Sequence, residues 1–392
     1  MEGIRPDLRV INYSLLGTDW YINQLRYKLN QSPPVDVIFT PEQIQGNNRN
    51  VVPVYALPGY DQTKYYDLEK ILRDVVASED DKNKVAMQSG EQANVVPVKK
   101  VTIPVDIEAV KKSMKFNAGD SILSELKIDI TRNYIQKNDL AVLALIAANK
   151  WKRPIYFTST QELKALGLEK YVRMEGLSYR LVPVENNGTP VPETELAYKN
   201  VMEKFKYGNA SKPHVYFDEE NRRHINSVRL AHATLAKALI SEGKKDEAKK
   251  SLEKYDQSVS ESNVPYGMTS NRGNFHNSVS ADFLEASYLS GDITLAKKVN
   301  QSIKKDLEQQ LAYYRSLGEE DLSNEQLAMQ SAAILNNKGG TLSDKQRTFA
   351  YDILSSYQML EQLKQWEQQY KTATPPSMEV PVDSLKMPGK EK

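Results

Sequence analysis

The pattern of hydrophobic and polar positions separates a mixed first half from a helical second half. Residues 8–16 form a β-rich apolar run, and a helical pattern follows the turn at Gly17-Thr18-Asp19 through about residue 28. A strand, a tight turn and a helix in this order are typical of an α/β unit. Further short apolar or β-like runs cover residues 35–39, 95–105, 153–160 and 178–184. We therefore expect an α/β N-terminal half, with helices on a mixed, partly parallel sheet.

Three details refine this expectation. Pro97 and Pro104 interrupt the run at 95–105, which favours edge strands. Residues 120–148 have a helical pattern, and its last part is apolar nearly all round, which predicts a buried helix. The segment Ser159-Thr-Gln-Glu162 fits a capping box that opens the next helix.

The second half is helical almost throughout. A turn-rich segment, residues 185–192, precedes it and is expected to act as a linker. The predicted helices cover residues 193–206, 220–242, 244–260, 277–290, 292–317, 322–337 and 343–371. Long helices with short connections predict antiparallel pairs. We expect an α/β domain at 1–187, a helical domain at 188–372 and a proline-containing, disordered tail at 373–392.

Two of the predicted helix pairs share a spacing of small and apolar residues. The first pair contains Leu235, Ala236, Leu239, Gly243, Ala248 and Leu252, and the second contains Phe283, Leu284, Gly291 and Ala296. This spacing matches a tetratricopeptide (TPR) hairpin, although the pairs are 48 residues apart and the usual repeat is about 34. The pattern predicts a TPR-like half, and an ordinary helical hairpin with a small residue at the crossing is the alternative.

Composition narrows the class of protein. Lys and Arg number 52 against 51 Asp and Glu, so the net charge is +1. The sequence shows no basic stripe, which argues against a nucleic-acid partner. The longest apolar run, residues 140–148, is shorter than the about 20 residues that a membrane span requires, and the start does not resemble a signal peptide. The chain has no cysteine, which excludes disulfides and thiolate catalysis and suits an oxidising compartment.

No motif for a cofactor or metal is present. The sequence contains no P-loop, no GxGxxG, no GxSxG and no HExxH. His224 and His232 are eight residues apart on one predicted helix but lack a third ligand in sequence. We therefore expect neither a cofactor nor a metal.

The turn after the first predicted strand is the first candidate binding site. Asp19 and Trp20 open the helix there, and Ser159 follows the predicted strand at 153–160. If the two strands are parallel neighbours, these side chains would line one crevice at their carboxyl ends. The alternative is structural, with Thr18 and Ser159 as helix N-caps and Asp19 complementing the helix dipole.

Two loops supply the other candidates. The chain has 22 Tyr against 8 Phe and 3 Trp, and Tyr60, Tyr65 and Tyr66 share one irregular segment. Tyrosine suits sugar rings and peptides, but it can equally hold a long loop to the surface beneath it.

The second loop, residues 262–276, is long for a helical array, and such loops are often functional. Its candidate residues are Tyr266, Asn271, Arg272, Asn274 and His276. The alternative for this loop is a connector that packs on the α/β half.

The first 25 residues carry a more specific pattern. Glu2-Gly-Ile-Arg-Pro-Asp-Leu-Arg-Val-Ile-Asn12 is followed by Ser14-Leu-Leu16 and by Thr18-Asp-Trp-Tyr-Ile22 with Gln24-Leu25. This stretch resembles the bacterial inner-membrane family called domain of unknown function 2723, or protein O-mannosyltransferase-like. Its members resemble multi-span GT-C glycosyltransferases that use lipid-linked sugar donors, with a region of helical repeats after the spans. The present sequence lacks the spans and the family's Gly-Asp-Asn-Asp segment, so the 392 residues would be a C-terminal part.

The resemblance implies a non-catalytic region on the periplasmic face of the inner membrane. It would position an acceptor protein, or cap the membrane active site of a glycosyltransferase-like protein. The expected partners are its own membrane domain and an acceptor protein or glycan, and no residue here inherits a catalytic role. A stand-alone TPR-like scaffold for protein interactions is the first alternative. An enzyme that acts on a sugar or phosphate in the crevice near Asp19 is the second.

Overall fold

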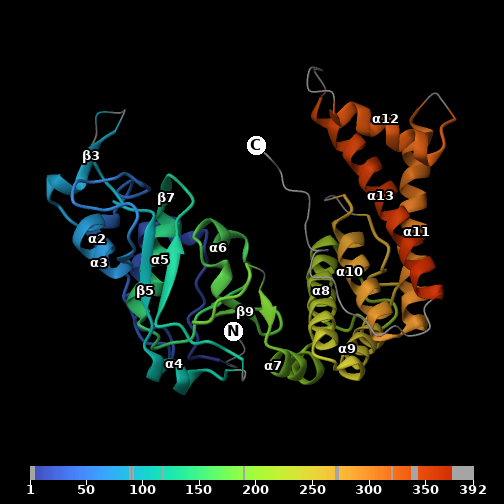
Figure 1. Cartoon of the computed structure of the whole chain (residues 1–392), viewed down its shortest axis with the longest axis horizontal. Helices are drawn as coiled ribbons and strands as arrows, with labels where there is room; N and C mark the ends of the chain where they lie inside the picture. Colours follow the sequence, from blue (N-terminus) through green and yellow to red (C-terminus); the bar gives the residue numbers. More distant parts are fainter. Residues whose placement is uncertain are drawn as a thin grey trace. The chain divides into compact units, whose positions relative to one another are not determined.

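The computed structural model describes residues 5–87, 90, 92–116, 119–188, 190–269, 273–318, 321–336 and 343–372. The chain divides into two compact units, Met1–Ala197 and Tyr198–Lys392. The first contains mixed sheets with helices, and the described part of the second consists of packed antiparallel helices (Figure 1). The predicted fold class, α/β followed by all-α, is confirmed. The predicted disordered tail, residues 373–392, lies outside the described residues.

The strands of the first unit form several small sheets. One has the order β2 (Tyr66–Asp67), β5 (Lys100–Pro104), β6 (Glu125–Asp129), in which β2 is parallel and β6 antiparallel to β5. Another has the order β11 (Val191–Pro192), β9 (Val172–Met174), β10 (Tyr179–Leu181), β8 (Tyr156–Phe157), in which β11 and β9 are parallel. Two antiparallel pairs join β1 (Val51–Pro53) to β7 (Tyr134–Gln136) and β3 (Lys84–Ala86) to β4 (Gln92–Asn94).

Helix α5 (Lys137–Asn149) lies at the centre of the first unit's core (Figure 1). It is apolar around almost its whole circumference, as predicted, and Leu140, Leu143 and Ala144 are fully buried. It packs against η1 (Leu15–Gly17) and α3 (Leu68–Lys70). The other helical elements of this unit are α1 (Asp19–Gln24), α2 (Pro41–Ile44), the π-helix η2 (Ile71–Val76), η3 (Asp81–Asn83), α4 (Ile107–Ser113), α6 (Gln161–Ala165) and η4 (Glu169–Tyr171).

The predicted first strand, residues 8–16, is wrong. Residues 8–14 are irregular and lead into the 3₁₀ turn η1, in which the Gly17 N–H bonds to the Ser14 carbonyl oxygen. Leu8 and Val10 are exposed, so no sheet neighbour covers the apolar side chains that suggested a strand. The helix that follows ends at Gln24 rather than near residue 28.

Four further expectations for the first unit need correction. The region 120–136 contains β6 and β7, so the one or two helices predicted over 120–148 reduce to α5, which begins at Lys137. Strand β5 lies between β2 and β6 rather than at an edge, and Pro104 is its last residue. The capping box at 159–162 is absent, because Thr160 is the N-cap of α6 and makes no side-chain bond. The expected linker at 185–192 includes β11, which pairs with β9.

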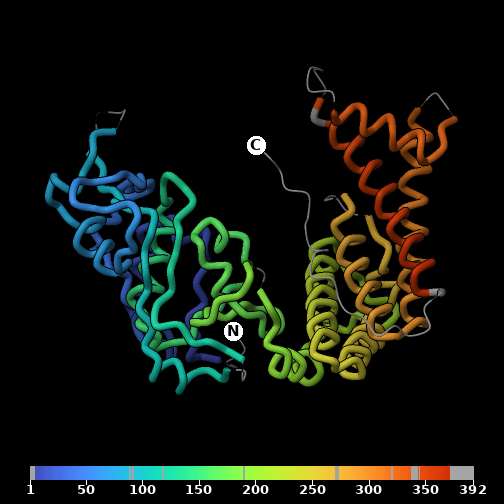
Figure 2. Tube along the Cα trace, viewed as in Figure 1, coloured from blue at the N-terminus to red at the C-terminus, as the bar shows by residue number. Residues whose placement is uncertain are grey.

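The second unit follows the predicted helices closely. After α7 (Thr194–Lys199) and the π-helix η5 (Asn200–Lys204), the helices are α8 (Glu219–Ser241), α9 (Lys245–Ser258), α10 (Phe275–Ser290), α11 (Ile293–Ser316), α12 (Asn324–Asn336) and α13 (Asp344–Thr372). Figure 2 shows the path of the chain through this unit, in which consecutive long helices reverse direction. Helix α8 packs against α9 and α10, and α11 packs against α10 and α13.

The residues of the repeated spacing occupy matching places in two hairpins. Gly243 and Gly291 follow the first helix of each hairpin with positive φ values of 79° and 83°. Ala248 and Ala296 lie in the following helices, and both are fully buried. Helices can approach closely at such small residues, which explains the spacing. Whether the hairpins are TPR-like stays a prediction.

Candidate functional site

Asp19 holds a turn of its own unit. Its carboxylate accepts hydrogen bonds from the Gly46 N–H (2.9 Å) and the Trp20 N–H (2.6 Å), and these bonds keep the pKa of Asp19 below its usual value. The buried Lys137 amine donates to the carbonyl oxygens of Ile44 (2.9 Å) and Gly46 (2.6 Å). Gly46 has a positive φ of 54°, which suits glycine. Asp19 and Lys137 together therefore anchor the turn at 44–46.

The predicted crevice required two parallel neighbouring strands, and residues 8–14 form no strand. Trp20 instead projects at the surface, with its ring edge against Tyr21 at 5.6 Å between ring centroids. Thr18 is the N-cap residue of α1 and Asp19 lies in its first turn, as the structural alternative expected. The Thr18 side chain makes no capping bond, and its hydroxyl donates to the Leu15 carbonyl oxygen at 2.7 Å. Ser159 accepts a bond from the Gln161 N–H at 3.2 Å.

The tyrosine segment packs on its own unit. The rings of Tyr60 and Tyr66 are 5.3 Å apart, and the Tyr66 hydroxyl accepts a bond from the Asp61 N–H at 2.8 Å. The Tyr65 hydroxyl donates to the Asp129 carboxylate at 3.0 Å at the end of β6. Burial and this hydrogen bond raise the pKa of Tyr65. These contacts tie the loop to the β2-β5-β6 sheet.

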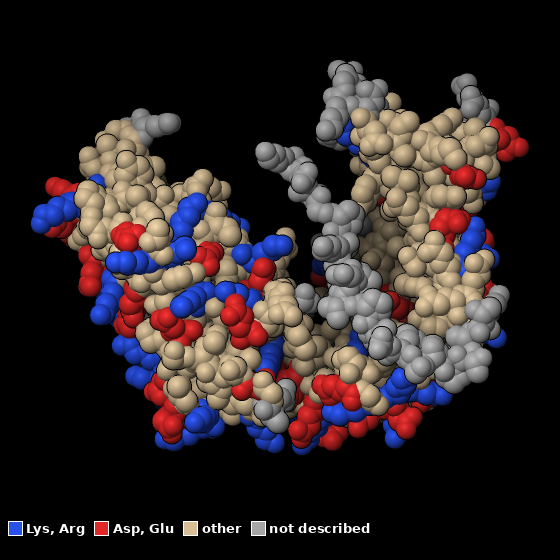
Figure 3. Space-filling view, viewed as in Figure 1, with Lys and Arg blue, Asp and Glu red and all other residues tan. Residues whose placement is uncertain are grey.

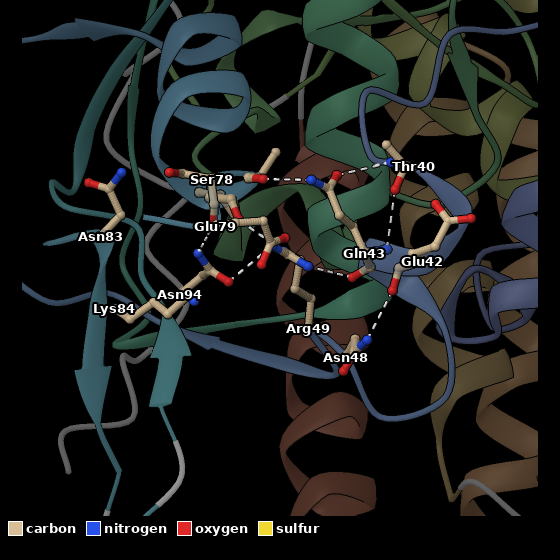
Figure 4. Close-up of polar contacts among 12 residues, drawn as sticks. Thr40, Glu42, Gln43, Asn48, Arg49, Ser78, Glu79, Asn83, Lys84 and Asn94 are labelled. Carbon is tan, nitrogen blue, oxygen red and sulfur yellow. Dashed lines mark hydrogen bonds and ion pairs between the residues drawn. The ribbon is translucent and has the colours of Figure 1, made fainter. Parts of the chain in front are cut away.

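A buried arginine that the sequence analysis missed organises the preceding loop (Figure 4). The Arg49 guanidinium donates to the carbonyl oxygens of Val76 (2.9 Å) and Gln43 (2.6 Å) and to the Asn94 side chain (3.0 Å). The Glu79 carboxylate lies 3.7 Å away. Arg49 thereby joins α2, the end of η2 and β4, three segments that are distant in sequence.

Tyr266, in the predicted binding loop, is buried. Its hydroxyl donates to Asp256 at 3.0 Å, and the Arg229 guanidinium lies 4.6 Å from its ring centroid. Burial raises the pKa of Tyr266 well above its usual value. These contacts assign this tyrosine a place in the interior rather than on an open surface.

Arg229 is the centre of this interior cluster and was also missed. It is 0% exposed, and each of its five N–H groups has an acceptor. The acceptors are the Tyr255 hydroxyl, the Asn226 and Ser280 side chains, and the carbonyl oxygens of Val264 and Pro265. The last two belong to the loop, so Arg229 holds the loop against α8.

Asn274 closes the other end of the loop. Its amide donates to the hydroxyls of Ser355 (2.9 Å) and Ser356 (2.8 Å) on α13. Its carbonyl oxygen accepts from Asn277 (3.1 Å) and Gln310 (2.9 Å). All four contacts are internal. Asn271 and Arg272 lie outside the described residues.

His276 differs from the other candidates. Its side chain is fully buried, yet neither ring nitrogen has a hydrogen-bond partner among the described residues. The Glu219 carboxylate is 3.9 Å from Nε2, too far for a hydrogen bond. Burial lowers the pKa of His276, which favours the neutral ring.

The described residues contain no group of three or more His, Asp or Glu side chains arranged to hold a metal ion. In the view of Figure 3, Lys and Arg alternate with Asp and Glu over the first unit, and neither sign covers a broad area of that face. Within each unit, most of the described candidate residues thus have structural partners, and His276 is the exception.

Comparison with known proteins bears on the family of this chain. No curated protein and no solved structure matches the chain. None of the described helices combines the length and the apolar character that crossing a bilayer requires. The family model of TMEM260-associated domain 2 matches residues 1–203, slightly more than half of the 392 residues, and so places the chain with a TMEM260-like membrane protein. The chain therefore belongs to the TMEM260-associated domain 2 family.

Proposed function

We propose that this chain is a non-catalytic region of a membrane glycosyltransferase-like protein and that it positions an acceptor protein for the membrane active site. The observation that carries the proposal is the match of residues 1–203 to a domain associated with a membrane protein. The resemblance of residues 2–25 to the O-mannosyltransferase-like family adds the reaction class and the periplasmic side. Capping of the membrane active site is the second role that this location would allow.

The chemistry of the candidate residues supports a role without catalysis. A general acid or base needs a group within reach of substrate and a pKa near the working pH. The Asp19 carboxylate instead accepts two backbone N–H bonds, and its pKa is shifted away from neutrality. Tyr65, Tyr266 and Asn274 are likewise engaged in bonds within their own units. Each of these side chains has a structural partner that explains it.

The helical unit supports recognition of a protein. Its hairpins α8–α9 and α10–α11 place equivalent glycines and alanines 48 residues apart. Stacked hairpins of this kind form extended surfaces that bind peptides. The same feature supports the alternative, a TPR-like scaffold that works without a membrane enzyme.

The test uses the membrane protein that carries this region, purified with lipid-linked sugar donor. Transfer is measured to a folded acceptor protein and to a short peptide containing the acceptor residue, with and without residues 198–372. Loss of transfer to the folded acceptor, with transfer to the peptide retained, supports positioning. Equal transfer to both acceptors in both forms contradicts it.

A second measurement separates the enzyme alternative. The purified 392-residue chain is incubated with the same donor and acceptor, beside an Asp19→Asn variant. Turnover by the chain alone that the variant abolishes would overturn the non-catalytic assignment. Turnover only in the presence of the membrane part agrees with it.

A further inference from the structure

The N-terminal segment of the first unit exposes an unusual number of large apolar side chains. Six lie within residues 8–29, and three of them are more than half exposed: Val10 at 80%, Tyr27 at 69% and Trp20 at 52%. The full set is Leu8, Val10, Leu15, Trp20, Tyr27 and Leu29. Single exposed apolar residues are normal on a protein surface, whereas a concentration of them marks an interaction site.

Hydrogen bonds place the two parts of this segment side by side. The Gln31 N–H donates to the Pro6 carbonyl oxygen at 3.1 Å, and the Arg9 guanidinium donates to the Tyr27 carbonyl oxygen. Residues 6–10 thus run next to residues 27–31. The Asn12 N–H donates to the Tyr21 hydroxyl at 2.8 Å, which connects the Trp20–Tyr21 ring pair to the same region. We call the exposed side chains of residues 8–29 the N-terminal face.

Positive charge is in excess beside this face. Burial and the nearby charge of Arg153 lower the pKa of Arg9, so the two guanidinium groups are close enough to repel. Arg153 donates to the Ser32 hydroxyl at 3.0 Å, and among the described residues neither arginine forms an ion pair. Arg9 Nε has no partner there. Asp7 pairs with Arg5 at 2.8 Å, and its carboxylate is also near Arg153, so one acid faces these three arginines.

We propose that the N-terminal face docks on an anionic lipid bilayer. Val10, Leu8 and Leu29 would enter the apolar boundary, while Trp20 and Tyr27 have the apolar body and polar tip that favour the membrane interface. Arg9, Arg153 and the exposed Lys28 would meet lipid phosphates. Arginine and aromatic residues are also enriched at protein interfaces, so absence of binding to vesicles would point to a protein partner instead. The inference needs only this chain and does not depend on the proposed role in glycosyl transfer.

Vesicle binding tests the proposal directly. The chain is sedimented with vesicles of equal parts phosphatidylcholine and phosphatidylglycerol, and with phosphatidylcholine alone. Three basic residues at the surface predict binding to the anionic vesicles that is on the order of 100-fold tighter. Trp20 emission should shift to the blue on binding, and the shift should vanish in Trp20→Phe.

Matched variants distinguish binding through the N-terminal face from non-specific binding of the chain to vesicles. Val10→Glu and Lys28→Glu should each weaken binding about tenfold, because one removes apolar burial and the other reverses a charge. The controls are Tyr216→Glu, which changes an 85% exposed apolar residue of the other unit, and the exposed Lys305→Glu on α11. Unchanged binding in both controls supports the proposal. Equal losses in variants and controls, or no preference for anionic vesicles, would overturn it.

Discussion

Replacing Arg229 by methionine should destabilise the helical unit by about 3–5 kcal/mol. The guanidinium is 0% exposed and makes five hydrogen bonds, two of them to the carbonyl oxygens of Val264 (3.1 Å) and Pro265 (3.0 Å). Methionine fills a similar volume but offers no donor. The two loop carbonyls and the hydroxyls that Arg229 serves would then lose their partner.

The magnitude follows from which groups remain behind. Each buried acceptor that loses its donor costs about 1–3 kcal/mol. Removing a buried charge offsets part of this cost, because the charge no longer has to be desolvated. Replacing a whole buried ion pair by apolar residues can leave the free energy of unfolding unchanged. In Arg229→Met the partner groups stay in place, so the acceptors left without a donor make the change destabilising. The rings of Tyr255 and Tyr266 also lose the cation that lies 5.4 Å and 4.6 Å from their centroids.

Hydrogen exchange in increasing urea is the suitable assay, because it reports the stability of each unit separately. A single unfolding transition of the whole chain would combine the two stabilities. Peptides from α8, α10 and the loop between α9 and α10 should lose protection in Arg229→Met. The control is Arg223→Met, six residues earlier on α8, whose partner Glu220 is exposed. It should cost less than about 1 kcal/mol. Arg229→Lys restores charge with only three donors and should recover little. A loss below about 1 kcal/mol in Arg229→Met would refute the reasoning.

Three further predictions concern the interior. Burial lowers the pKa of His232 from 6.5 to about 4, so the unfolded chain binds a proton that the folded chain does not. The unfolding free energy of the helical unit should therefore fall by roughly 3 kcal/mol as the pH drops from 6.5 to 4, and a pH series of His232→Gln should show a flatter profile. Gly267→Ala should lower the free energy of unfolding by roughly 2–4 kcal/mol in thermal unfolding, since its new Cβ would lie 2.0 Å from a carbonyl oxygen of α11. The control, Gly243→Ala, has open space around the new Cβ and should cost about 1 kcal/mol because of its positive φ. Lys137→Met should destabilise the first unit by about 2 kcal/mol in urea, because two carbonyls of the 44–46 turn lose their donor, and an unchanged midpoint would contradict that role.

The helices of the second unit could be predicted from the sequence because their apolar period persists over many turns. Helix α8 runs from Glu219 to Ser241 against a predicted 220–242, and Gly291 ends α10 in the left-handed conformation, one residue beyond the predicted end at 290. A long periodic signal averages out local exceptions. Glycine then marks the turn, since few other residues adopt a positive φ at low cost.

The first unit was harder because its strands are two to five residues long. Runs this short give a weak signal, and pairing with distant segments decides which of them become strands. Residues 8–16 have strand-like composition but no pairing partner, so tertiary contacts overrode local preference there. Residues 125–129 do alternate between polar and apolar side chains, and the segment pairs along its whole length with β5, but its pattern was assigned to a helix.

For two candidate residues of the second unit, the structure favours the structural alternative over a binding site. Tyr266 and Asn274 looked available for a ligand because they belong to a long loop, and the structure gives them internal partners. Arg229 was missed as a buried polar residue, and His232 was considered only as a metal ligand. Both fall on the apolar stripe of α8 with Ile225 and Leu235, and a polar residue on such a stripe predicts a buried, hydrogen-bonded group.

The loop between α9 and α10 is held on both sides, which changes what the helical unit can offer a partner. On one side Arg229 binds its carbonyls. On the other, Asp306 Oδ2 on α11 accepts bonds from Thr269 (3.0 Å), Asn277 (2.7 Å) and Gln310 (2.9 Å). A segment with this many internal partners would lose them if it moved to meet a ligand. Its described part therefore acts as a rigid joint between the two hairpins, and recognition by this unit would have to use the outer faces of its helices.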